Sequence, residues 1–205
     1  MLKLIIKLYG AVVRGLWEPA SSRVYGELIR ARGVILGRGA KIYGMPIISL
    51  YKGSDITVGD QAVLRSSSRG NAIGVNHPIV IRTLWHGASI RIGDNFGMSG
   101  GAICAARNIT IGNNVMIGAN TVIADTDFHD PLRPGQRGET GVEGSKDVRI
   151  EDEVWIGADV YVCKGVVIGR GAVIGAKSVV TKSIPPNCVA VGVPARVIRK
   201  LDGMS

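Results

Sequence analysis

His129 is the residue of this 205-residue chain whose type and position best suit proton transfer. It stands near the start of a polar segment, residues 127–147, that reads DFHDPLRPGQRGETGVEGSKD. An imidazole titrates near neutral pH, which suits general acid–base catalysis. A long irregular segment in a regular scaffold is commonly a functional loop. Position alone leaves two interpretations open, a catalytic base and an ordinary loop histidine.

The numbers and positions of the cysteines and histidines disfavour disulfides, a cysteine nucleophile and a zinc site. There are three of each: Cys104, Cys163 and Cys188, and His77, His86 and His129. An odd number of cysteines without CxxC spacing predicts free thiols in a reducing compartment, and therefore a cytoplasmic protein. No cysteine lies beside a base in a nucleophile motif. A catalytic zinc site needs three good ligands, and the histidines are too scattered to supply them, so we expect no bound metal.

A period of six residues indicates the scaffold that holds these groups. Branched aliphatic residues recur at this interval late in the chain, at Ile150, Ile156, Val162, Ile168, Ile174 and Val180. Four positions after each comes another small or β-branched residue, and glycine often follows the aliphatic. A six-residue period in a short chain is typical of a β-solenoid. Side chains alternate along short strands, so three hexads would close one triangular coil of about 18 residues.

The same period extends toward the N-terminus. It includes Ile92, Met98 and Cys104, which we expect to face inward, and then Ile111, Ile117 and Ile123 after a shift of one residue. An ordinary parallel sheet with helices is disfavoured, because no helical period separates the strands after Ile90. We predict an all-β solenoid over residues 33–200, with interruptions at about 66–89 and 127–147 and a short C-terminal cap.

Residues 1–32 are predicted to form an N-terminal helical segment. Within residues 1–17, basic residues share one helical face and aliphatic residues cover the rest. Charges interrupt this stretch too often for a membrane span, which needs about 20 apolar residues. We favour a helix that covers the open end of the solenoid or packs on a neighbouring subunit, because solenoid ends must be covered. Peripheral contact with an anionic membrane surface is the alternative.

Net charge narrows the range of partners. The chain carries 25 basic and 16 acidic residues, for a formal charge of +9. This charge suits an anionic ligand such as a nucleotide cofactor, an acidic glycan or an anionic lipid surface. Nucleic acid is disfavoured, because neither a reading motif nor an aromatic platform accompanies the charge.

Three motifs resemble those of the hexapeptide-repeat acyltransferases, in particular the sugar and polysaccharide O-acetyltransferases related to the maltose, galactoside and nodulation-factor enzymes. The motifs are ADTDFHDP at 124–131, EDEVWIGADV at 151–160 and IGAKSVVTKSIPPNCVAVGVPARVIRK at 174–200. The resemblance implies a left-handed parallel β-helix and a homotrimer with active sites between adjacent prisms. It also implies acetyl-coenzyme A as the acyl donor.

The resemblance implies a role for each matching residue of the reaction centre. His129 matches the general base that takes the proton from an acceptor hydroxyl, which then attacks the thioester directly. The backbone N–H of Ala158 matches the donor that stabilises the developing oxyanion. Asp127, two residues before His129, has two interpretations, one as the group that orients the imidazole and one as a residue that solvates the loop.

Contacts with the coenzyme are implied for the later coils. The matching residues are Trp155, Ala158, Ala176, Thr181, Lys182, Arg196 and Arg199. Small side chains at the two alanines would leave room for the pantetheine arm. The arginines match positions where basic side chains meet phosphates, a pairing that charge-assisted hydrogen bonds favour.

The acceptor is the point at which the chain departs from the sugar acetyltransferases. Residues 98–106 read MSGGAICAA and are nearly devoid of the polar side chains expected to bind a sugar there. This stretch looks more like acetyltransferases of capsule, exopolysaccharide or lipopolysaccharide assembly. The candidates for acceptor contact are then Ser99, Arg107, Arg133 and the first interruption with His77 and His86, although a structural role is favoured for His77.

Several other functions stay open. A non-catalytic solenoid scaffold is the main alternative, and a γ-class carbonic-anhydrase-like metal protein is a weaker one. Within acetyl transfer, the acceptor could be an amino sugar or an antibiotic in place of a sugar hydroxyl.

Overall fold

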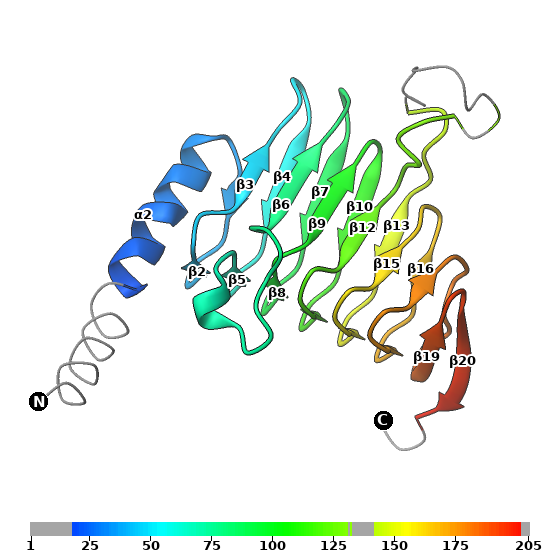
Figure 1. Ribbon diagram of the computed structural model, residues 1–205. Helices are drawn as coiled ribbons and strands as arrows, with labels where there is room; N and C mark the ends of the chain where they lie inside the picture. The colour runs from blue at the N-terminus through cyan, green and yellow to red at the C-terminus, as the bar shows by residue number, and fades with distance from the viewer. Residues whose placement is uncertain (1–17, 131, 133–141, 202–205) are drawn as a thin grey trace, which may run out of the picture.

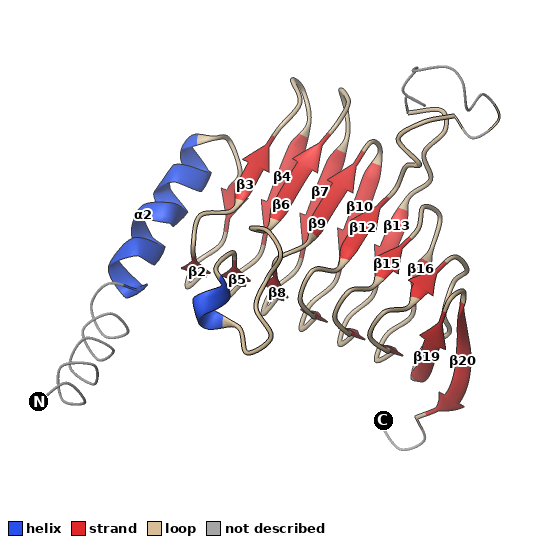
Figure 2. Cartoon of the chain, in the orientation of Figure 1, coloured by secondary structure: helices blue, strands red, loops and turns tan. Residues whose placement is uncertain are grey.

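The computed structural model describes residues 18–130, 132 and 142–201. The helix α2 (Glu18–Ala31) leads into a long stack of short strands, which ends in a two-stranded hairpin (Figure 1). One connection contains a short 3-10 helix, η2 (Ser68–Gly70). Figure 2 shows how strands and loops make up the rest of the described chain.

The strands form three sheets, and successive strands join successive sheets. The first sheet holds β1 (Ile35–Leu36), β4 (Asp55–Val58), β7 (Ser89–Ile92), β10 (Asn108–Ile111), β13 (Val148–Ile150) and β16 (Val167–Ile168). The second sheet holds β2 (Lys41–Tyr43), β5 (Val63–Arg65), β8 (Gly97–Ser99), β11 (Met116–Ile117), β14 (Trp155–Ile156), β17 (Val173–Ile174), β19 (Cys188–Gly192) and β20 (Ala195–Lys200). The third sheet holds β3 (Ile47–Ser49), β6 (Val80–Thr83), β9 (Ala102–Ala105), β12 (Val122–Ala124), β15 (Tyr161–Val162) and β18 (Val179–Val180).

All neighbouring strands pair in parallel except β19 and β20, whose antiparallel hairpin closes the C-terminal end. Each turn through the three sheets is one coil, and each coil hydrogen-bonds to the next. The predicted β-solenoid with an N-terminal helix is confirmed.

The residues that recur every six positions are the ones that form the hydrophobic core. The six aliphatic residues from Ile150 to Val180 that define it are each no more than 1% exposed. Their partners four positions on are also buried, from Val154 at 1% to Ile184 at 5%. Burying one such aliphatic side chain contributes about 1.5–3 kcal/mol, so the stacked columns dominate the stability of the coils.

The inward position predicted for Cys104 is wrong. Ile103 is fully buried in its place, and Cys104 lies on the outer face of β9. The chain turns there through two left-handed glycines, Gly100 (φ 56°) and Gly101 (φ 80°), which shorten the step from Met98 by one residue. The predicted inward residues of the next coil, Ile111, Ile117 and Ile123, are buried.

Two edges of the solenoid carry most of the candidate site residues, and we name these edges by the sheets that they join. At the second-to-third edge the chain passes from the second sheet to the third, and at the third-to-first edge it passes from the third sheet to the first sheet of the next coil. Residues 125–147 leave the third-to-first edge between β12 and β13. The range 66–89, expected as one interruption, contains β6, so only residues 66–79 depart from the second-to-third edge.

The helix α2 covers the N-terminal end of the stack (Figure 1). The Ser22 hydroxyl accepts a hydrogen bond from Ile42 N (2.8 Å), and the Arg30 guanidinium donates to the carbonyl of Leu36 (3.1 Å). Ile29 of the helix is 1% exposed and joins the core. The predicted membrane or packing role of residues 1–17 lies outside the described residues. Within the described part of the chain, no helix is long and apolar enough to cross a membrane.

Candidate active site

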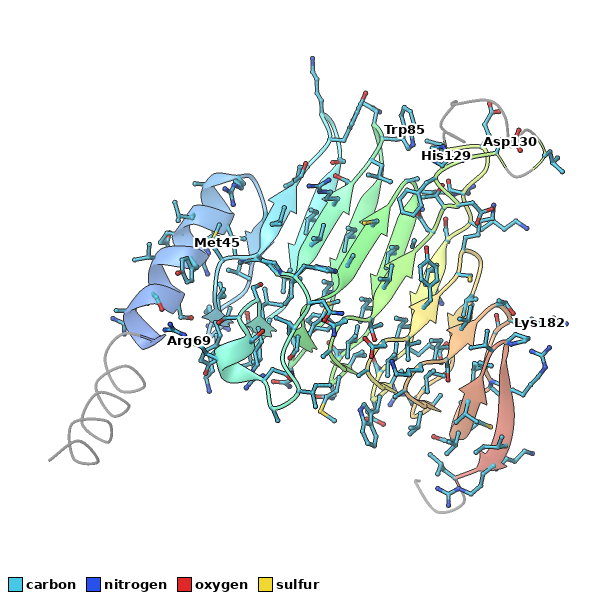
Figure 3. The ribbon with its side chains drawn as sticks, in the orientation of Figure 1. Met45, Arg69, Trp85, His129, Asp130 and Lys182 are labelled. Carbon is cyan, nitrogen blue, oxygen red and sulfur yellow. The ribbon has the colours of Figure 1, made fainter. Side chains whose placement is uncertain are left out.

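His129 lies at the third-to-first edge, five residues after the end of β12. Its side chain is exposed and stands at the base of the long loop (Figure 3). The rigid stack beneath it therefore positions the start of the loop, while the imidazole is accessible to another molecule.

The buried side chain of Asp125 holds the two ends of the long loop against the stack. Its two oxygens accept hydrogen bonds from the backbone N–H groups of Ala106 (2.6 Å) and Arg107 (2.8 Å) on the preceding coil. Its carbonyl accepts from Lys146 N (2.8 Å), at the other end of the loop. Burial raises the pKa of the Asp125 carboxyl, although the backbone N–H groups of residues 106–108 act in the opposite direction. Asp125 thus ties both ends of the loop to the stack.

The residue before the histidine has an unusual backbone conformation. Phe128 adopts a left-handed φ of 65°, which is rare for a bulky side chain. Its N–H donates to the Thr126 hydroxyl (3.2 Å), which closes a tight turn. Strained residues of this kind gather at functional sites, where the surrounding structure holds them in place.

Asp127 pairs with a lysine from the next coil. Its Oδ2 lies 2.7 Å from Lys164 Nζ, and the same ammonium donates to the Gly144 carbonyl (2.8 Å). Lys164 therefore joins the start and the end of the long loop. The sequence analysis missed this residue, although its place just after the hexad residue Val162 puts it on the same edge one coil later. The proposed role of Asp127 in orienting His129 stays a prediction.

The two predicted alanines occupy equivalent positions on successive coils of the second-to-third edge. The N–H groups of Ala158 and Ala176 donate no hydrogen bond to any residue in the described part of the chain, whereas Asp159 N and Lys177 N bond to the coils before them. The turn is tight at this point, because a Cβ at Gly157 would lie 2.6 Å from Ala176 N. The edge therefore presents two unengaged backbone donors beside small side chains.

The remaining residues predicted for the coenzyme are exposed and spread over the later coils. Trp155 lies on the outer face of β14 and is 53% exposed. Thr181 and Lys182 follow β18 on the third-to-first edge (Figure 3). Arg196 and Arg199 belong to β20, in the C-terminal hairpin. The cations thus lie toward the C-terminal end of the stack.

The predicted acceptor residues fall on two different edges. Ser99 ends β8 at the second-to-third edge and is 8% exposed. Arg107 lies at the third-to-first edge, where its Nε is 2.9 Å from an oxygen of Asp147. Arg133 lies outside the described residues.

The predicted base and the predicted oxyanion donor do not meet within one chain. His129 is on the third-to-first edge, and Ala158 is on the second-to-third edge, so the width of the third sheet separates them. A strand of about four residues spans ~13 Å, more than an acyl group in transfer can bridge. Trp155 and Ala176 lie near Ala158, at or beside the second-to-third edge, and not near His129.

The histidines and cysteines form no further site in the described residues. No group of three or more His, Cys, Asp or Glu side chains there is placed to hold a metal ion. His77 lies in the segment 66–79 at the second-to-third edge, and His86 lies at the third-to-first edge. Burial raises the pKa of the Cys104 thiol and of the Cys163 thiol, which disfavours the nucleophilic thiolate form.

Comparison with known proteins relates two segments of this chain to hexapeptide-repeat transferases. Residues 147–182 match the family described as bacterial transferase hexapeptide (six repeats), and residues 108–124 match the hexapeptide repeat of succinyl-transferase. The galactoside O-acetyltransferase of Escherichia coli is 42% identical over 120 residues, which cover 57% of this chain and 57% of that protein. The galactoside O-acetyltransferase of Lactococcus lactis is 50% identical over 95 residues, or 46% of this chain and 44% of that protein.

The chain thus spans about half the length of the curated relatives that it matches. Among solved structures, a mutant of AntD, an N-acyltransferase from Bacillus cereus crystallised with a dTDP-amino sugar and coenzyme A, superposes with a TM-score of 0.60 at 21% identity. That superposition covers 85% of this chain and 88% of AntD.

The three sheets, the six-residue period and the matched segments define a hexapeptide-repeat protein. More specifically, the chain is similar to hexapeptide-repeat acetyltransferases over about half of its length.

Proposed function

We propose that this protein is an acetyl-coenzyme A-dependent O-acetyltransferase that acts on a sugar hydroxyl, in the assembly of a capsule, exopolysaccharide or lipopolysaccharide in the cytoplasm. The observation that carries the proposal is the pair of complementary half-sites. One edge presents an exposed imidazole on a fixed loop, and the other presents the unengaged N–H of Ala158. The identity with two galactoside O-acetyltransferases supports the class of acceptor.

The two half-sites support a homo-oligomer, which we propose to be a trimer. A threefold arrangement of identical prisms would bring the third-to-first edge of one chain against the second-to-third edge of the next, by a heterologous contact that closes. Each interface would then combine His129 of one chain with Ala158, Ala176 and Trp155 of its neighbour.

In this mechanism His129 takes the proton of the acceptor hydroxyl as the oxygen attacks the thioester carbon. The N–H of Ala158 donates to the developing oxyanion, which a preformed backbone donor stabilises without reorganisation. As the tetrahedral intermediate collapses, the carbon–sulfur bond breaks and the imidazolium returns the proton to the leaving thiolate. The products are the O-acetyl sugar and free coenzyme A, and no acyl-enzyme forms.

The coenzyme fits the residues on the C-terminal half of the stack. Alanines at 158 and 176 leave space and offer N–H donors for an amide-rich pantetheine arm. Lys182, Arg196 and Arg199 are exposed cations that would meet its phosphates.

The test is a thiol-release assay with acetyl-coenzyme A and a panel of monosaccharide, oligosaccharide and amino-sugar acceptors. We expect acceptor-dependent release of free thiol, with an O-acetyl product identified by mass spectrometry. Transfer only to amines would show an N-acetyltransferase. No release with any acceptor, from protein that binds the coenzyme, would favour the scaffold alternative.

A further inference from the structure

Two aromatic side chains lie on the edge that carries His129, outside the proposed reaction centre. Tyr51 lies in the connection from β3 to β4, and Trp85 lies in the connection from β6 to β7. Their ring centroids are 6.1 Å apart and their planes are inclined by 45°. Tyr51 is 46% exposed, and Trp85 is partly exposed. The hydrophobic core does not need them, because it is filled by the aliphatic columns.

The two connections hold the aromatic rings in a fixed arrangement. Tyr51 N donates to the Thr83 hydroxyl (2.9 Å), which also lies 2.6 Å from the Ser54 hydroxyl. Gly87 N donates to the Gly53 carbonyl (3.0 Å). The His86 ring packs so closely over Gly53 that a Cβ there would lie 2.6 Å from it. The pair is therefore preorganised, which lowers the entropy lost when a ligand binds.

The aromatic pair and His129 lie along one line of the solenoid. Strand β6 pairs with β9, and β9 pairs with β12, so the connection of Trp85 is two coils away from the loop of His129. At the spacing of neighbouring strands this is ~10 Å. Figure 3 shows Trp85 and His129 at the same edge. On the coil between them, β9 is joined to β10 by only Ala106 and Arg107. This connection is shorter than those that carry Trp85 and His129.

We propose that Tyr51 and Trp85 form a stacking subsite for a second sugar ring, and that the acceptor is a glycan chain running along this edge from His129 past Arg107. The faces of aromatic rings carry negative charge density, which attracts the polarised C–H groups on the flat face of a pyranose. A separation of two coils is about two sugar rings long, so the stacked ring would lie two residues along the glycan from the acetylated one. The inference rests on the proposed acetyl transfer and adds the class of acceptor.

Two exposed cations close in sequence to the aromatic residues favour an acidic glycan. Lys52 is exposed next to Tyr51, and Arg82 projects from the outer face of β6 next to Cys104 on β9. Cations near a binding edge raise the local concentration of an anionic ligand and steer its approach.

The experiment compares short and long acceptors with the intact protein. The acceptors are methyl β-galactoside, β-1,4-galactotetraose and α-1,4-tetragalacturonate, and the variants are Trp85→Ala, Tyr51→Ala and Trp85→Phe. We expect Trp85→Ala to lower kcat/KM for a tetrasaccharide about tenfold more than for the monosaccharide, because a lost stacking contact acts only on the longer acceptor. Trp85→Phe should restore most of the difference, and Ile35→Ala, an exposed residue of the first sheet, should behave as wild type.

Equal losses for short and long acceptors, or no loss for either, would overturn the subsite. A change of oligomeric state in Trp85→Ala, measured by light scattering, would show a subunit contact and would overturn it too. If wild type releases no thiol with any acceptor, the proposed function fails on this panel. Calorimetric titration with both tetrasaccharides then tests the subsite alone, and no binding that depends on Trp85 would refute it.

Discussion

The loop of His129 is held by residues that each contact another coil. Asp125 bonds to the coil before it, and Lys164 reaches from the coil after it to Asp127 and to the Gly144 carbonyl. The backbone is thus fixed on both sides of an exposed imidazole. If His129 is the general base, this fixed backbone would let it meet a hydroxyl with little further loss of entropy.

Replacement of His129 by alanine is expected to lower kcat by at least about a hundredfold, because general-base catalysis contributes on that order. The side chain is exposed, so the melting temperature should stay within the range of surface substitutions. Steady-state kinetics with acetyl-coenzyme A and an active acceptor measure the effect. Leu132→Ala, in the same loop and 88% exposed, is the matched control. Near-normal turnover in His129→Ala would refute the general-base assignment.

The thiols of Cys104 and Cys163 are expected to react slowly at neutral pH. Burial raises both pKa values above the usual range for a thiol, and only the thiolate is nucleophilic. Alkylation by iodoacetamide, followed by mass spectrometry at pH 7 to 10, should be slower than for glutathione and should rise steeply in the alkaline half of this range. Fast labelling of either residue at pH 7 would contradict the shift and reopen an acyl-cysteine route.

At the scale of elements, the turn at Gly100 and Gly101 sets the register of the third coil. A Cβ at Gly101 would clash with the Thr121 carbonyl of the next coil, and its φ of 80° disfavours any side chain. Gly101→Ala should therefore destabilise the protein by about 3 kcal/mol through clash and backbone strain. Urea denaturation followed by circular dichroism measures the change.

Gly97→Ala is the control from the same coil. A Cβ at Gly97 would meet no atom within 4 Å, so this change should alter stability by no more than about 0.5 kcal/mol. Equal effects of the two substitutions would show that the turn does not determine the register.

The sequence predicted the elements well where one rule governs each position. The hexads from Ile150 to Val180 could be assigned because every coil repeats the same inward aliphatic residue. Cys104 was misplaced because two adjacent glycines shorten a corner, and a period alone does not reveal the length of a corner. The contact of Lys164 with Asp127 could not be predicted, because it depends on how an irregular loop folds back on the stack.

At the scale of the whole molecule, the two edges explain why one chain would carry only half of the proposed site. His129 and the free N–H of Ala158 are separated by the third sheet, and the rigid stack cannot bring them together. The six-residue period alone does not predict that His129 and Ala158 lie apart. That follows only when each residue is assigned to an edge of the solenoid, because the edge decides which subunit the residue can contact. Activity should therefore depend on assembly.

Mixing two inactive variants tests this central claim most directly. His129→Ala removes the base, and Ala158→Trp fills the space beside the proposed oxyanion donor, so each should be inactive alone. Mixed trimers, purified through a different tag on each variant, should regain about a third of the wild-type sites, because each contains one interface that joins an intact His129 to an intact Ala158. Thiol release measures the recovery. No recovery in mixed oligomers of native stability would contradict a site shared between chains.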